Sequence, residues 1–167
     1  MLSEEQVERA IDLYANDVRR LCFIYCKSEA DVDDIFQNVF IKYYKLDEPF
    51  TDPTYEKAWI LRVTINACKD LFKSWFRKNA ELTDDFSQFS IDPKDSDGEL
   101  ILEVRKLRKE YATVIYLYYY EEYSLKEIAA ICNASINTIS SRLQRARKEL
   151  KKRLGGEILN EENEAIR

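Results

Sequence analysis

Apolar side chains recur at intervals of three or four residues along most of the chain, which is the period of an amphipathic helix. The longest such stripe lies between residues 136 and 154 and consists of Ile136, Ile139, Leu143, Ala146, Leu150 and Leu154. The positions between them are polar, so one face of a long helix is predicted to be buried and the other exposed. Only three Gly and three Pro interrupt the 167 residues. This pattern predicts an all-α fold.

Two shorter stripes occur in the first half of the chain. One consists of Ile35, Phe36, Val39, Phe40 and Tyr43. The other consists of Trp59, Ile60, Val63, Ala67, Leu71 and Trp75. Both have helical spacing, and we expect most of these side chains to form a helical core in the N-terminal half.

The segment from residue 124 to residue 136 carries the signals of two closely joined helices. Ser124 followed by Glu127 is the capping-box arrangement that begins a helix. Asn133 tolerates the left-handed conformation of a turn, and Ser135 is placed to cap the next helix. Two helices joined by a three-residue turn form a helix-turn-helix, whose second helix can enter the major groove of DNA.

The polar face of the predicted second helix has residue types that suit DNA. Short side chains near the helix start can approach base edges, while arginines and lysines can neutralise phosphates. The candidate contacts with duplex DNA are Asn137, Thr138, Ser140, Ser141, Arg142, Gln144, Arg145 and Lys148. An ordinary amphipathic helix with a basic solvent face is the alternative. We interpret the segment as DNA-binding because the capping signals, the turn length and the basic residues coincide.

Charge is distributed in blocks along an acidic chain whose net charge is -5. Residues 51–80 carry a net charge of +3 and residues 125–154 one of +6, whereas residues 81–103 carry -7. The acidic block is also poor in apolar residues, which favours a flexible linker over the solvated face of a single domain. We therefore predict two small helical domains, residues 1–80 and 104–154, joined by a linker at 81–103 and followed by a tail at 155–167.

The cysteines and the acidic residues give little sign of metal or cofactor chemistry. The four cysteines, at positions 22, 26, 68 and 132, lie in apolar helical runs without a Cys-x-x-Cys pair, and the chain has no His. We interpret them as buried thiols and expect no metal site and no cofactor. Asp31, Asp33 and Asp34 suit the start of a helix. An enzyme that binds magnesium through these acids is a weaker alternative, because no partner residues are visible elsewhere.

The chain does not open with a charged and then apolar leader, and no run of eighteen apolar residues occurs in it. We expect a cytoplasmic protein without membrane insertion.

Three stretches resemble bacterial RNA polymerase sigma factors, specifically the small extracytoplasmic-function (ECF) group of the sigma-70 family. EIAAICNASINTISSRLQRARKEL is similar to their C-terminal helix-turn-helix domain, and SRLQRAR within it is a specific match. EADVDDIFQNVFIKYYK resembles the helix that docks on the coiled coil of the polymerase β′ subunit. AWILRVTINACKDLFKSWFRK resembles the helix that opens and reads the downstream promoter element. The resemblance spans about residues 8–154.

The resemblance implies a promoter-specificity subunit rather than an enzyme, with the helix-turn-helix on the upstream promoter element. The implied partners are the polymerase core, through its β′ coiled coil and β flap, promoter DNA and an anti-sigma protein. The residues implied in core docking are Asp33, Asp34, Gln37, Asn38 and Phe40. Those implied in contacts with the melted downstream element are Phe50, Tyr55, Arg62, Asn66, Lys69, Lys73 and Arg77.

The chemistry of these residue types agrees with the implied roles. The amide of Asn66 can hydrogen-bond an exposed base edge, while the cations beside it follow the backbone of a single strand. Phe50 and Tyr55 lie in the loop LDEPFTDPTYEKAW, which by resemblance pockets a flipped base. Their rings can stack on such a base, although anchoring of the loop explains them equally well.

The chain departs from the family pattern at several positions. The family often has Glu in place of Asn38, Gly in place of Asn133 and Asn137, a Lys near Ser140 and a Pro near Arg108. Ser140, in place of a long cation, leaves the family's preference for a particular upstream element open. The alternative function is a stand-alone helix-turn-helix regulator that binds DNA as a dimer, with residues 1–80 as a sensor or dimerisation domain.

Overall fold

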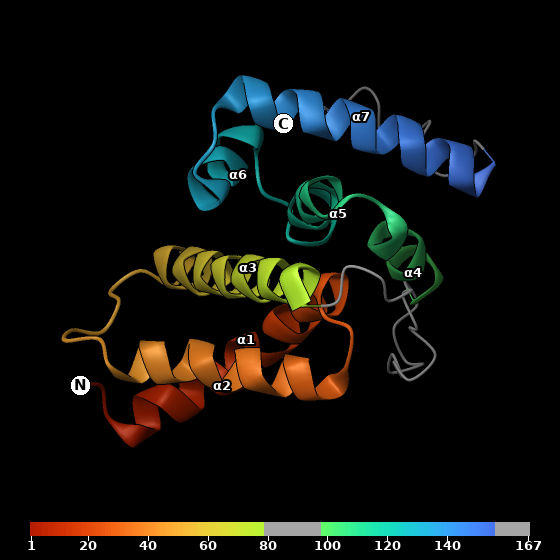
Figure 1. Ribbon diagram of the computed structural model, residues 1–167. Coiled ribbons are helices and arrows are strands. Elements are labelled where there is room, and N and C mark those ends of the chain that lie inside the picture. The colour runs from red at the N-terminus through yellow and green to blue at the C-terminus, as the bar shows by residue number, and fades with distance from the viewer. Residues whose placement is uncertain (79–97, 156–167) are drawn as a thin grey trace. The chain divides into compact units, whose positions relative to one another are not determined.

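The computed structural model describes residues 1–78 and 98–155, and all regular structure in those two ranges is helical. The chain divides into two compact units, residues 1–90 and 91–167. The first contains α1 (Glu4–Tyr25), α2 (Glu29–Tyr44) and α3 (Pro53–Lys78). The second contains α4 (Gly98–Lys106), α5 (Lys109–Ile115), the π-helical turn η1 (Tyr116–Tyr120), α6 (Leu125–Cys132) and α7 (Ile136–Leu154) (Figure 1). The predicted all-α fold with two helical units is confirmed.

The acidic linker predicted at residues 81–103 lies largely outside the described residues, as does the tail after Gly155. The last part of the predicted linker is helical, because α4 begins at Gly98 and buries Ile101 and Val104. The linker was predicted to end where the acidic residues end, at residue 103. The helical unit begins earlier than that, because the apolar side chains of α4 already pack in its core. Within the described ranges, no helix is long and apolar enough to cross a membrane.

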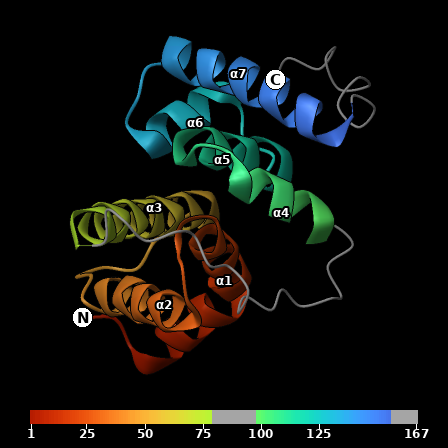
Figure 2. The same cartoon turned by 45° about the vertical axis from the view of Figure 1, so that its right-hand side comes forward.

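The N-terminal unit is a three-helix bundle in which each helix contacts the other two, as Figure 2 shows from a second direction. On α2 the predicted stripe is largely confirmed, because four of its five residues are buried and Phe36 is half-buried. The buried residues of the stripe are Ile35, Val39, Phe40 and Tyr43.

The buried face of α3 differs from the predicted stripe. Besides Glu56, its buried residues among those described are Ile60, Leu61, Thr64, Ile65 and Cys68. Of the predicted set only Ile60 is among them. The side chain of Trp75 lies outside the described residues, and the half-buried members are Trp59, Val63, Ala67 and Leu71.

Thr64 explains this difference. Its hydroxyl donates a hydrogen bond to the Ile60 carbonyl at 2.7 Å, so its polar group is satisfied within the helix and can be buried. A prediction that counts only apolar residues treats Thr64 as exposed, and it therefore assigned the neighbouring face of α3 to the core.

In the C-terminal unit α7 packs on α4, α5 and α6, and η1 continues α5. The predicted stripe on α7 is shorter than expected. Leu154 is half-buried, and Ile136 is 47% exposed. Ile136 is the first residue of α7, and a helical side chain leans toward the helix start, so it extends over the turn and away from the packed face. The stripe is confirmed at Ile139, Leu143, Ala146 and Leu150.

A buried carboxylate joins the three helices of the N-terminal unit. Glu56, in the first turn of α3, is 1% exposed. It accepts hydrogen bonds from the Tyr43 hydroxyl of α2 at 2.5 Å and from the Tyr14 hydroxyl of α1 at 2.8 Å. Arg9 of α1 donates a third at 2.5 Å and supplies the opposite charge. Sequence patterns did not indicate this cluster, because Arg9 and Glu56 are 47 residues apart.

The members of this cluster shift one another's pKa values. Burial alone would raise the pKa of Glu56, but hydrogen bonds from Tyr43, Tyr14 and Arg9 outweigh it and hold that pKa below the ordinary value of 4.5. Burial and the hydrogen bond to Glu56 raise the pKa of both Tyr14 and Tyr43 to about 12. Near neutral pH, therefore, Glu56 is a charged acceptor and both hydroxyls are donors.

Replacing Glu56 with Gln should destabilise the N-terminal unit by about 2–4 kcal/mol, because the new amide group is itself a donor among three donors. The measurement is the free energy of unfolding from denaturant titration at neutral pH. Glu8, an exposed carboxylate on α1, provides the matched control, and Glu8→Gln should change stability by less than about 0.5 kcal/mol. Equal effects of the two substitutions would contradict the role of Glu56.

The stability difference between the wild type and Glu56→Gln should also depend on pH. Because folding lowers the pKa of Glu56, its stabilising contribution is present above the ordinary value of 4.5 and is lost as the pH falls through the lowered value. The difference in unfolding free energy should therefore narrow on acidification. A difference that stays constant through the acid range would show that Glu56 does not stabilise the unit through its charge.

Candidate nucleic-acid interface

The local geometry of the predicted helix-turn-helix is confirmed. Ser124 and Glu127 form the capping box of α6, in which each side chain accepts a hydrogen bond from the other's backbone N–H at 3.2 Å. Asn133 ends α6 in the left-handed region, with φ at 51°. Ser135 caps α7 by accepting a hydrogen bond from the Thr138 N–H at 3.1 Å. The start of α7 is thereby fixed relative to α6.

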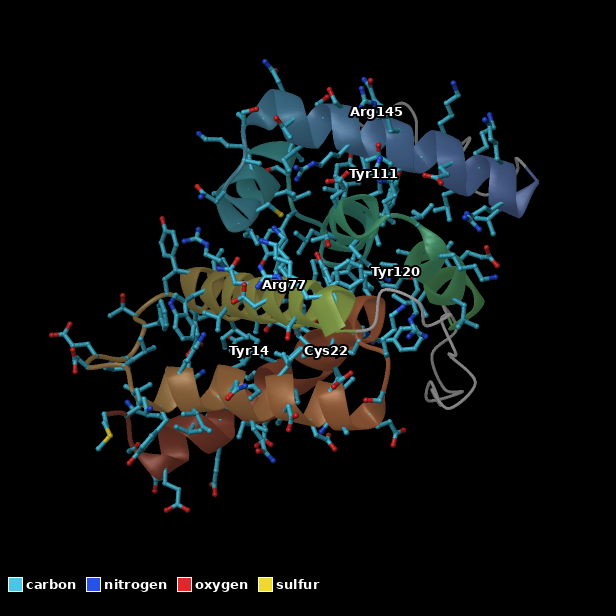
Figure 3. The ribbon with its side chains drawn as sticks, viewed as in Figure 1. Tyr14, Cys22, Arg77, Tyr111, Tyr120 and Arg145 are labelled. Carbon is cyan, nitrogen blue, oxygen red and sulfur yellow. The ribbon has the colours of Figure 1, made fainter. Side chains whose placement is uncertain are left out.

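A hollow of about 440 Å³ lies where the start of α7 meets the start of α5. Figure 3 labels Arg145 on α7 and Tyr111 on α5, which line it together with Arg108 and Glu110. Five of the residues predicted to contact duplex DNA also line it, namely Asn137, Thr138, Ser141, Arg142 and Arg145. The hollow therefore brings together most of the predicted upstream contacts.

The other three predicted contacts on α7 lie outside this hollow. Gln144 and Lys148 are exposed, and Ser140 is half-buried. The hydroxyl of Ser140 is therefore less accessible to a ligand than those of Thr138 and Ser141, which are exposed.

The sequence did not predict that residues at the start of α5 would line the hollow. Arg108 lies 3.8 Å from the carboxylate of Glu110, and its guanidinium lies 5.6 Å from the ring centroid of Tyr111. The basic pair Arg108 and Lys109 is visible in the sequence, but no local pattern pairs the start of α5 with the start of α7. Only the packing of α5 on α7 brings these side chains to the hollow.

The composition of the hollow suits a polyanion. It contains three guanidinium groups, from Arg108, Arg142 and Arg145, against the single carboxylate of Glu110. Guanidinium groups hold phosphate oxygens through paired hydrogen bonds. Amide and hydroxyl side chains, here including Asn137, can hydrogen-bond either phosphates or base edges.

Arg147, although part of the basic motif SRLQRAR, is held within its own unit. Its Nε donates a hydrogen bond to the Tyr119 hydroxyl at 2.6 Å. Its guanidinium lies 5.2 Å from the ring centroid of Tyr118 and 5.6 Å from that of Tyr119. Arg147 therefore fastens α7 to η1, and the adjacent basic residue Lys148 is the exposed one.

On the N-terminal unit, the cations and the amide predicted to contact a single strand share one face of α3. Successive members are three or four residues apart, which places them on the same side of a helix. Lys69 is half-buried, and the exposed members are Arg62, Asn66, Lys73 and Arg77, the last of which is labelled in Figure 3. This face offers hydrogen-bond donors along most of the length of α3.

The segment predicted as a loop, residues 46–59, is helical from Pro53 onward, so Tyr55 belongs to α3 and Phe50 lies before it. These two aromatic residues have different surroundings. Tyr55, in the first turn of α3, is 70% exposed. Phe50 packs beside Tyr43 and Trp59, with ring centroids 6.5 Å and 5.8 Å away. These contacts support the anchoring role for Phe50 and leave Tyr55 as the ring available for stacking.

The residues predicted to dock on the polymerase also differ in how exposed they are. Asp33, Asp34, Gln37 and Asn38 are exposed on α2, whereas Phe40 is 5% exposed and lies in the core. Phe40 packs in the core, so its burial favours a supporting role beneath the exposed surface, and its assignment to polymerase docking stays a prediction. The acidic residues in the first turn of α2 are Glu29 and Asp31, and Ser28 caps it.

Three of the four cysteines converge in the N-terminal unit. The sulfur atoms of Cys22 on α1, of Cys26 directly after α1 and of Cys68 on α3 all lie within 4.8 Å of one another. All three are buried as predicted, and Cys132 in the other unit is half-buried. Their convergence was not predicted, although the four-residue spacing of Cys22 and Cys26 places both on one helix face. Figure 3 labels Cys22.

The surroundings keep the thiols of Cys22 and Cys68 protonated near neutral pH. Hydrogen bonding with Cys26 and burial raise the pKa of Cys22, against a lowering contribution from Cys68. Hydrogen bonding with Cys22 and Cys26, together with burial, raises the pKa of Cys68.

Two family models match the chain. Sigma-70 region 2 matches residues 10–79, and Sigma-70, region 4 matches residues 97–150. Among curated proteins, the ECF RNA polymerase sigma factor SigW of Bacillus subtilis (strain 168) is 29% identical over 161 residues, covering 86% of this chain and 86% of SigW. RNA polymerase sigma factor SigV of the same organism is 29% identical over 150 residues, covering 88% of this chain and 90% of SigV.

Solved structures share the fold. The sigma factor RpoE from Bartonella quintana, in complex with the anti-sigma factor NepR, superposes with a TM-score of 0.75 at 20% identity, covering 90% of this chain and 97% of RpoE. CnrH, in complex with the cytosolic domain of CnrY, superposes with a TM-score of 0.63 at 20% identity, covering 93% of this chain and 91% of CnrH.

The two matched regions fall one on each helical unit. The chain belongs to the sigma-70 family of RNA polymerase sigma factors, and its curated relatives place it in the ECF group. Sigma factors act in transcription initiation and are not enzymes. Family membership therefore rules against the magnesium-dependent enzyme considered above.

Proposed function

We propose that the chain binds RNA polymerase core and directs it to specific promoters through three separate surfaces. The start of α7 contacts the upstream element as duplex DNA, α3 captures the downstream element as it melts, and α2 docks on the core. The observation that carries the proposal is the hollow at the start of α7, where five polar or basic side chains of α7 meet Tyr111 of α5 and Arg108, the residue before α5.

At the upstream element the start of α7 enters the major groove. Asn137 and Thr138 are exposed there, and their amide and hydroxyl groups can reach base edges. Arg145, with Arg108 directly before α5, holds the phosphate backbone. The exposed Ile136 adds an apolar group of the kind that contacts a thymine methyl.

At the downstream element α3 binds the single strand that melting exposes. Asn66 hydrogen-bonds a base edge, the cations on the same face follow the sugar-phosphate backbone, and Tyr55 stacks on an unpaired base. Unstacking a base costs a few kcal/mol, and these contacts offset that cost. Melting is therefore driven by binding free energy and needs no covalent chemistry.

Docking on the core uses the exposed acidic and amide groups of α2. Asp33, Asp34, Gln37 and Asn38 face basic residues of the β′ coiled coil, while Phe40 supports this surface from the core. The chain as a whole carries a net charge of -5, which weakens its attraction to DNA when it is alone. Tight promoter binding therefore requires the polymerase core.

An anti-sigma protein is proposed as a further partner. The two solved structures with this fold were determined as complexes, RpoE with the anti-sigma factor NepR and CnrH with the cytosolic domain of CnrY. A protein that covers the docking surface of α2 would keep the chain from the polymerase.

The double substitution Asp34→Ala with Gln37→Ala should weaken binding to purified core polymerase by about 10- to 100-fold, because it removes a charge and an amide from the docking surface. Binding is measured by fluorescence titration of the labelled full-length chain with core. The pair Asp12→Ala with Asn16→Ala, an exposed acid and amide on α1, is the matched control and should leave affinity unchanged. Loss of core binding in both double variants would reject α2 as the docking surface.

Arg145→Ala should weaken promoter binding by the assembled holoenzyme by about 1–3 kcal/mol and leave its affinity for core unchanged. Arg153→Ala removes the same charge from the exposed last turn of α7 and serves as the control, with a smaller effect expected. The readout is promoter DNA titration at fixed salt. A free chain that binds promoter duplex as a dimer, as tightly as the holoenzyme does, would instead establish the stand-alone regulator.

A further inference from the structure

The thiols of Cys22, Cys26 and Cys68 lie apart from the three surfaces that the proposed function uses. They are buried in the N-terminal unit, where α1 packs on α3. All three sulfur atoms lie within 4.8 Å of one another, and two helices contribute them. An inference about this cluster is therefore independent of the proposed function.

The geometry of the cluster is close to that of a bound metal ion. In a tetrahedral site, metal–sulfur bonds of about 2.3 Å place the sulfur atoms roughly 3.8 Å apart, and in a three-coordinate pyramidal site they lie about 3.5 Å apart. The three sulfurs, all within 4.8 Å of one another, therefore need to approach by about 1.3 Å at most, which side-chain rotation can supply. Cys22 lies in the last turn of α1 and Cys26 directly follows that helix, so Cys68 of α3 completes a triangle of ligands that the packing of α1 on α3 holds in place.

Burial and the ligand set select the class of ion. Among the described residues, this cluster consists of three sulfur ligands and no carboxylate, and the chain has no His to add. Three thiolates and a divalent ion form a site with a net negative charge, and such an ion also takes a fourth ligand. Three thiolates and a monovalent ion form a site with a still larger negative charge. Burying uncompensated charge is costly. A trivalent ion bound by three thiolates is neutral and complete with three ligands.

We propose that Cys22, Cys26 and Cys68 form a binding site for a trivalent thiophilic ion of the arsenite class. Arsenous acid condenses with the three thiols, so three arsenic–oxygen bonds break and three arsenic–sulfur bonds form. The three thiol protons leave with the three hydroxide groups as water, and no atom changes its oxidation state. The product is a neutral arsenic tris-thiolate in an apolar core.

Binding at this site joins α1 to α3. A ligand that binds the folded state and not the unfolded one stabilises the fold, so the melting temperature of the N-terminal unit rises with arsenite concentration. Because all three thiols are buried, the ion enters through a local opening of the helices, and binding is slow compared with reaction at an exposed thiol.

The test uses the reduced full-length chain and sodium arsenite, with native mass spectrometry as the readout. The expected product has the mass of one added arsenic atom less three hydrogen atoms. Each of Cys22→Ser, Cys26→Ser and Cys68→Ser should lose this product, because two thiols leave a hydroxide on arsenic. Cys132→Ser, at the half-buried cysteine of the other unit, is the matched control and should keep it. The three-hydrogen product persisting in any of the first three variants would overturn the proposal.

A second measurement needs no substitution and so does not depend on the folding of the variants. X-ray absorption at the arsenic edge of the wild-type complex should show three sulfur neighbours and no oxygen neighbour. An oxygen atom bound to arsenic would overturn the proposal. Displacement of arsenite from the wild-type chain by zinc would overturn the proposal as well, because the charge of the buried site predicts that a trivalent ion binds more tightly than a divalent one.

Discussion

The N-terminal unit depends on the pairing of one buried carboxylate. Glu56 belongs to the first turn of α3, Tyr43 to the end of α2, and Arg9 and Tyr14 to α1, so a single acceptor determines where the three helices meet. A buried charge without partners costs several kcal/mol, and any other register of the helices would leave Glu56 in that state. The exposed acids of α2 and the cations of α3 are presented by helices that this cluster holds in register.

Features that depend on residues close in sequence were predictable, and features that depend on packing were not. Ser124, Asn133 and Ser135 were assigned correctly because caps and turns are decided within about four positions. The convergence of Cys68 with Cys22, and of the start of α5 with α7, depends on how helices far apart in sequence pack. The buried face of α3 was assigned incorrectly for a local reason. The Thr64 hydroxyl hydrogen-bonds within its own helix and can be buried, whereas a polar residue in the sequence is predicted to be exposed.

The phenyl rings in the predicted binding surfaces pack against neighbouring aromatic side chains, whereas most of the polar residues are exposed. Phe40 is buried and Phe50 is half-buried, whereas Tyr55 and Asn66 are exposed. The predicted cations of α3 are exposed except for Lys69, which is half-buried. The physical reason is that burial against any neighbouring helix stabilises a phenyl ring. A phenyl ring in a motif can therefore either support the binding surface from within or contact the partner directly. For this chain, the polar and charged positions are the better guide to what a partner meets.

The attachment of Arg147 to η1 bears on how DNA binding would respond to ionic strength. Each cation that neutralises a phosphate releases counterions and steepens the dependence of the binding constant on salt by roughly 0.9 per contact. Residues 125–154 carry eight basic side chains, but the guanidinium of Arg147 is already engaged with Tyr118 and Tyr119. The salt dependence of the helix-turn-helix should therefore be shallower than its count of basic residues suggests, and base contacts should account for a larger share of its affinity.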